Sequence, residues 1–222
     1  MTTIYWQFKD TSAQALELAY FDPEPLLPEI SKIRNSRYVK CPAFLEYYKN
    51  TYLIRSPIDM TITYNKGQLT IYPQTQKFYD AYVIHRGHQI KETDPFLMSL
   101  NIQYLFIADK DCVVEQIPAM FHDISTKLRL ISGTFNIHKW FRPTDFAFEF
   151  INENEPIVIK RGDPLFYVKF KTPKDEKIVL KQKHFDESVF NNVKSCTNLK
   201  NAIPKCPLKV LYKLTERIKL KF

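Results

Sequence analysis

Short β-type segments separated by turn signals follow one another along most of this chain. Runs rich in β-branched and aromatic residues recur over the first 170 residues, and the runs at 60–64 and 68–72 flank an Asn-Lys-Gly turn. In the run at 60–64 apolar residues alternate with threonines, as in a strand with one buried face. This pair predicts a β-hairpin.

Further strands are expected at 4–8, 51–56, 99–106, 112–117, 127–131, 134–140, 146–150, 156–159 and 165–170. Turn signals at this spacing favour a mainly β fold with an antiparallel β-sandwich or jelly-roll-like core over βαβ units. The proline-rich stretch at 22–28 predicts an extended surface connection. The expected core contains Trp6, Phe8, Leu53, Ile62, Ile71, Leu105, Leu130, Phe148, Ile157, Val168 and Phe170.

Charge is distributed unevenly. Residues 1–170 hold 19 basic and 19 acidic residues, whereas residues 171–222 hold 13 and 5, so the last quarter carries the whole formal excess of +8. The pattern there is helical, at 186–193 and at 207–222, where Leu211, Leu214 and Ile218 share an apolar face. We expect a β-sandwich domain at 1–172 and a basic helical tail at 173–222, packed on the sandwich or extending from it.

The tail is a candidate site for nucleic acid or another acidic partner. Its residues for that role are Lys194, Lys200, Lys205, Lys209, Lys213 and Arg217. A solvated basic face that serves only solubility is the alternative.

Composition excludes several classes. Four glycines stand against fourteen prolines, and no Walker or dinucleotide fingerprint is present, so no cofactor is expected. No apolar run is long enough to span a membrane, and the first residues do not resemble a signal peptide. The four cysteines are scattered without a CxxC pair, which favours buried free thiols.

Two groups of polar residues are candidates for ligand binding. His138, Arg142 and Asp145 fall close together in the sequence, and Arg161 and Asp163 lie in a turn between two expected strands. That turn is similar to one in the dUTPase and dCTP deaminase jelly rolls, but the chain lacks the catalytic and phosphate-binding motifs of those enzymes. The similarity therefore indicates a shared turn and no shared catalysis.

Metal binding and nucleophilic catalysis have weaker support. His85 and His88 are three residues apart, a spacing that can chelate a metal on a turn, although surface histidines without function are common. No GxSxG elbow surrounds any serine, and no cysteine has a histidine close in sequence. These observations favour binding over catalysis.

Two blocks, the first at 37–44 with 49–59 and the second at 135–143 running into 160–164, resemble uncharacterised proteins of tailed bacteriophages, particularly aquatic T4-like ones. The resemblance implies a viral origin and expression in the cytoplasm of a bacterial host, with a place in the virion also open. It brings no known activity or catalytic residues.

Three functions follow as hypotheses. The first is a non-enzymatic binding or structural protein, either a minor virion component or a binder of a host or viral macromolecule. It predicts an exposed apolar patch and self-association. The second is a jelly-roll enzyme or sequestering protein for nucleotides or small metabolites. The third is a nucleic-acid-binding module that uses the basic tail.

Overall fold

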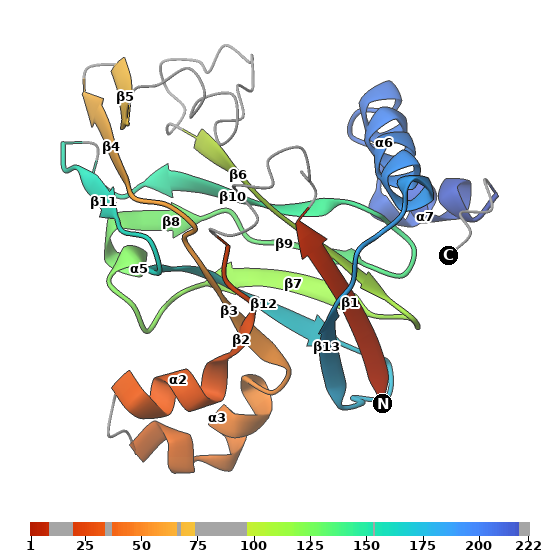
Figure 1. Ribbon diagram of the computed structural model, residues 1–222, viewed down its shortest axis with the longest axis horizontal. Coiled ribbons are helices and arrows are strands. Elements are labelled where there is room, and N and C mark those ends of the chain that lie inside the picture. The colour runs from red at the N-terminus through yellow and green to blue at the C-terminus, as the bar shows by residue number, and fades with distance from the viewer. Residues whose placement is uncertain (9–19, 34–36, 66–67, 74–96, 153, 218–222) are drawn as a thin grey trace.

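The fold is known from a computed structural model that describes residues 1–8, 20–33, 37–65, 68–73, 97–152 and 154–217. Two five-stranded sheets form a sandwich, and a three-stranded sheet extends from one side of it (Figure 1). Across the interior the ring centroids of Phe106 and Phe170 lie 5.3 Å apart, and those of Phe146 and Phe166 lie 5.7 Å apart. The prediction of a mainly β chain with antiparallel sheets and a short C-terminal helical segment is confirmed.

The first sheet contains, in spatial order, β13 (Ile178–Gln182), β1 (Thr2–Phe8), β6 (Leu97–Ala108), β10 (Pro143–Phe150) and β8 (Leu128–Leu130). The second contains β2 (Glu24–Pro25), β3 (Thr51–Arg55), β12 (Pro164–Lys171), β7 (Val113–Pro118) and β9 (Gly133–Asn136). The third contains β11 (Ile157–Ile159), β4 (Met60–Asn65) and β5 (Gln68–Tyr72). All pairs are antiparallel except β13 with β1.

The helices lie outside the sandwich. They are α2 (Leu26–Ile33), the 3₁₀-helix η1 (Arg37–Lys40), α3 (Pro42–Tyr47), α5 (Ile124–Lys127), α6 (Glu187–Ala202) and α7 (Leu208–Arg217). In Figure 1, α2 and α3 lie beside the β2–β3 end of the second sheet, and α6 and α7 lie at the opposite side of the molecule.

Strand alternation places the core as the sequence predicts. In β10 every second residue from Thr144 to Phe150 is buried, so its phenylalanines fill the sandwich. All eleven residues expected in the core are buried. Leu105 differs from the others because it faces outward from β6, into a second apolar cluster with Ile107, Trp140 and Phe141.

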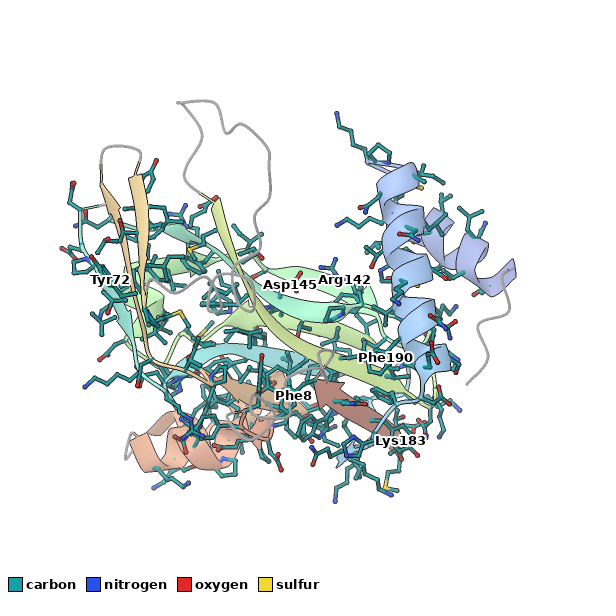
Figure 2. All side chains as sticks on the ribbon, turned by 45° about the horizontal axis from the view of Figure 1, so that its top comes forward. Phe8, Tyr72, Arg142, Asp145, Lys183 and Phe190 are labelled. Atoms are coloured by element: carbon teal, nitrogen blue, oxygen red, sulfur yellow. The ribbon has the colours of Figure 1, made fainter. Side chains whose placement is uncertain are left out.

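The C-terminal helices cover that second cluster. Val189, Val193 and Cys196 of α6 and Leu211 of α7 are buried against it. Lys183 and Phe190 mark the course of the chain past β1 and up into α6 (Figure 2). The basic helices are therefore docked on the outer face of the first sheet, and they do not extend freely from it.

Three local features differ from expectation. The prediction of an extended connection at 22–28 is wrong for residues 26–28, because α2 begins at Leu26 and Pro28 lies in its first turn, where a backbone N–H has no intrahelical partner. The strand expected at 134–140 ends at Asn136, whose side chain stabilises a turn. Strand β13 precedes the two helices within residues 173–222, which were expected to form a helical tail.

Candidate functional site

Arg142 and Asp145 form an ion pair at the beginning of β10. Arg142 Nη2 lies 3.7 Å from Asp145 Oδ2, and the guanidinium is 5.3 Å from the ring centroid of Phe135 (Figure 2). Gln116 Nε2 donates a hydrogen bond of 2.7 Å to the Asp145 carbonyl, which joins the two large sheets. The Arg142 guanidinium contacts both the Asp145 carboxylate and the Phe135 ring. The ion pair therefore helps to stabilise the start of β10.

His138 lies in the turn that follows β9. Its Nδ1 is 3.0 Å from the Ala108 carbonyl oxygen, a contact in which Nδ1 carries the proton and donates it. Asn136 caps the same turn, because its Oδ1 accepts from the backbone N–H groups of His138 at 2.9 Å and Lys139 at 3.1 Å. The turn supports α7 through Tyr212 and Thr215, whose hydroxyl groups bond the Asn136 N–H and the Lys139 carbonyl.

The other two predicted ligand residues lie in the turn between β11 and β12. Asp163 Oδ2 accepts from the Lys160 N–H at 2.8 Å, and the Arg161 guanidinium lies 4.7 Å from the ring centroid of Phe21. Gly162 has a φ of +90°, which non-glycine residues rarely adopt, and its N–H donates to the Ser56 carbonyl at 2.8 Å. The five predicted ligand residues thus lie in three places. His138 is in the turn after β9, Arg142 and Asp145 are at the start of β10, and Arg161 and Asp163 are in this turn.

Sequence reasoning missed the residue that fixes the turn, Arg55 at the end of β3. Its guanidinium donates to Gly162 O at 3.0 Å, to Glu24 Oε2 at 2.8 Å and to Glu29 Oε1 at 2.9 Å. The hydrogen bond from Arg55, opposed by desolvation and assisted by the nearby positive charge, holds the pKa of Glu29 below its usual value. Arg55 falls within the first phage-like block. No sequence pattern predicted its contacts with Glu24, Glu29 and Gly162, which are far from it along the chain.

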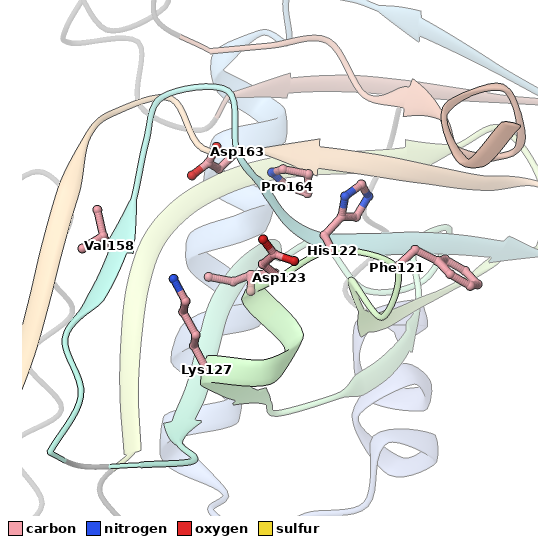
Figure 3. Close-up of a pocket in the computed structure, with 8 residues that line it drawn as sticks. Phe121, His122, Asp123, Lys127, Val158, Asp163 and Pro164 are labelled. Carbon is pink, nitrogen blue, oxygen red and sulfur yellow. The ribbon is translucent and has the colours of Figure 1, made fainter. Parts of the chain in front are cut away.

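A cavity of about 350 Å³ opens beside this turn, between the β11–β12 connection and α5 (Figure 3). Its lining consists of Phe121, His122, Asp123, Ile124, Lys127, Val158, Asp163 and Pro164. Burial, and secondarily the positive charge of Arg55, lowers the pKa of His122, so its imidazole is neutral at pH 7. Of the predicted residues whose side chains the structure describes, only Asp163 lines this cavity.

The lysines of the C-terminal helices form the second candidate site. Residues 188–215 contain five lysines and no aspartate or glutamate. Glu216, which follows this segment, forms an ion pair of 3.3 Å with Lys139, and Lys139 lies outside α6 and α7. Within the described chain, Lys194, Lys205, Lys209 and Lys213 are exposed and have no ion pair.

For three of the predicted site residues the structure describes no side chain. His85 and His88 lie outside the described residues, and of Arg217 only the backbone at the end of α7 is described. Within the part of the chain that the structure covers, no three His, Cys, Asp or Glu side chains are grouped to hold a metal ion. None of the described helices is long and apolar enough to cross a membrane.

The sequence matches no protein-family model and no curated protein.

Proposed function

We propose that this protein is a non-enzymatic binding protein that presents the basic surface of α6 and α7 to an acidic protein partner. The observation that carries the proposal is a set of exposed lysines on α6, on α7 and in the turn between them. Within the described chain, Lys194, Lys205, Lys209 and Lys213 have no ion pair, and the helices themselves are fixed to the sandwich. A preformed surface loses little conformational entropy when it binds, and unpaired lysines attract an acidic surface over several ångströms.

Apolar side chains between the lysines favour a protein over a nucleic acid. Ile203, Leu208 and Val210 are 41%, 38% and 45% exposed. On α7, Lys209 and Lys213 are one turn apart, and Val210 precedes Lys213 by three residues, so basic and apolar groups adjoin on the helix surface. Protein interfaces combine apolar contact with charge, whereas phosphate backbones are bound mainly by polar and cationic groups.

The resemblance to proteins of tailed bacteriophages supports a viral or host protein as the partner. The meeting place would be the cytoplasm of an infected bacterium or the virion, where this chain would act as a minor component.

Peptide binding tests the proposal. An acidic amphipathic helical peptide, with glutamates on one face and leucines on the other, should bind with an affinity that falls as salt rises. Changing Lys194, Lys205, Lys209 and Lys213 together to Gln should weaken binding by about tenfold or more, from several screened charge contacts. Val210→Ser should weaken binding of this peptide but not of polyglutamate. Fluorescence anisotropy measures all three.

The matched control removes the same charge elsewhere. Lys160, Lys174, Lys177 and Lys181 are exposed and lie outside α6 and α7, so their joint change to Gln should leave affinity unchanged. If both quadruple variants lost peptide affinity equally, binding would depend only on the net charge of the protein, and the proposal would be overturned. Tighter binding of a DNA duplex than of the peptide would identify nucleic acid as the partner instead.

A further inference from the structure

The cavity beside the β11–β12 turn combines charged and apolar walls. Phe121, Ile124, Val158 and Pro164 provide apolar surface, and His122, Asp123, Lys127 and Asp163 provide polar groups. Its volume of about 350 Å³ is within the range of sites that hold small molecules in proteins. It is separate from α6 and α7 and is not used by the function proposed above.

The two carboxylates come from different elements. Asp163 belongs to the β11–β12 turn and Asp123 precedes α5, and Figure 3 shows them on two sides of the space between these elements. The hydrogen bond from Lys160 N–H to Asp163 Oδ2 holds this side chain in place, while Asp163 Oδ1 has no hydrogen bond within the described chain. One carboxylate oxygen is therefore fixed by the turn and the other is available.

The charges of the cavity are not paired with one another. Asp123, Asp163 and Lys127 all line it, yet no ion pair within 4.0 Å joins them in the described part of the chain. Among the lining residues two carboxylates outnumber one ammonium group, and the neutral His122 adds no positive charge. Arg55, whose charge acts on His122 from outside the lining, is paired with Glu24 and Glu29. The cavity is thus locally anionic on a chain whose formal net charge is +8, which favours cations over anions.

We propose that this cavity binds a small organic cation, with a primary ammonium group between Asp123 and Asp163 and a short alkyl chain against Val158 and Ile124. The ammonium group supplies three donors, which suits two carboxylates that face it from different elements. The alkyl chain gains from contact with the apolar wall.

A series of five-carbon ligands tests the charge requirement. Isothermal titration of the full chain with n-pentylamine should give saturable binding, whereas the isosteric 1-pentanol and the anionic pentanoate should bind far more weakly. Binding of pentanol equal to that of pentylamine, or no saturable binding of pentylamine at millimolar concentrations, overturns the proposal. Tighter binding of Ca²⁺ or Mg²⁺ than of pentylamine, lost in Asp163→Asn or Asp123→Asn, would assign the cavity to a metal ion and also overturn the proposal.

Variants locate the binding. Asp163→Asn keeps an oxygen that accepts from the Lys160 N–H but removes the charge, and should weaken pentylamine binding at least about tenfold. Asp123→Asn, at an exposed residue, provides a second test should the first variant fold poorly. Lys127→Met removes the competing cation and should strengthen binding, a gain that damage to the fold would not produce.

The matched control is Asp109→Asn. Asp109 also accepts a backbone N–H through its side chain, from Thr3 at 3.1 Å, but it lies in the β6–β7 connection and does not line the cavity. Its change should leave pentylamine affinity unaltered. An equal loss in Asp109→Asn and Asp163→Asn would show that pentylamine responds only to total charge, which contradicts a site at this cavity.

Discussion

The Tyr212 hydroxyl oxygen accepts a hydrogen bond of 2.8 Å from the backbone N–H of Asn136. This bond joins α7 to the end of β9, and the ring of Tyr212 lies 6.4 Å, centroid to centroid, from that of Trp140. Thr215 adds a second bond, from its hydroxyl group to the Lys139 carbonyl at 3.0 Å. The basic helix is thus held by directional polar contacts as well as by its apolar face.

Tyr212→Phe should destabilise the protein by about 1–3 kcal/mol, because it leaves the Asn136 N–H without an acceptor at a largely buried position. Urea unfolding measures the change. Tyr47→Phe, which removes the hydroxyl group of an exposed tyrosine on α3, is the control and should have little effect. Equal stability of Tyr212→Phe and the parent would show that the bond does not contribute.

Gly162→Ala should cost about 1–2 kcal/mol, because an alanine at a φ of +90° is strained even though its Cβ would meet only Phe21 Cζ at 3.7 Å. Gly133→Ala is the matched control, since an added Cβ there meets nothing within 4 Å and its φ is not in the left-handed region. The two melting temperatures should differ, with Gly162→Ala the lower. Similar values would contradict the strain argument.

Acid should weaken the contact between Arg55 and Glu29. The folded pKa of Glu29 lies below its ordinary value of 4.5, chiefly because Arg55 donates a hydrogen bond to it. The unfolded chain therefore binds the proton more readily. The stability from this contact is complete above pH 4.5 and is lost as pH falls through the folded pKa.

Denaturant unfolding across this pH range measures the effect. Glu29→Gln should show a shallower loss of stability on acidification than the parent protein. Glu46→Gln, at an exposed residue of α3, should follow the parent curve. Superimposable curves for the parent and Glu29→Gln would refute the assignment.

The four cysteines should differ in reactivity. Cys41 is exposed, whereas Cys112 and Cys196 are buried. Burial, followed by the charge of Asp111, raises the pKa of Cys112 to about 12, and burial raises that of Cys196. In native protein a maleimide should label Cys41 quickly and leave Cys112 and Cys196 unmodified until denaturant is added. Cys41→Ser should abolish the fastest phase, and early labelling of Cys112 would contradict the burial.

Local sequence was sufficient to predict most strands and the core. The hairpin of β4 and β5 was predicted because alternation and an Asn-Lys-Gly turn act over neighbouring residues. In β10 a phenylalanine at every second position predicts that one face of the strand is buried, as the structure shows. These features depend on contacts within or between adjacent strands, so the sequence contains them.

Elements whose conformation depends on their surroundings were harder to predict. The proline-rich stretch leads into α2 because Pro28 occupies a first-turn position and Leu26 and Ile30 are buried in the core. The strand expected through residue 140 stops at Asn136 because its side chain captures two backbone N–H groups. Each outcome was decided by a contact that strand propensity does not describe.

The sequence by itself determined the mainly β fold, the buried face of each predicted strand and the basic character of the C-terminal quarter. Only the tertiary structure decided that α6 and α7 dock over Leu105 and Ile107, and that Asp163 lines the same cavity as His122 and Asp123. Asp163 and Asp123 lie on separate elements, forty residues apart in sequence. Periodicity acts over a few residues, whereas such a site requires long-range packing that brings distant segments together.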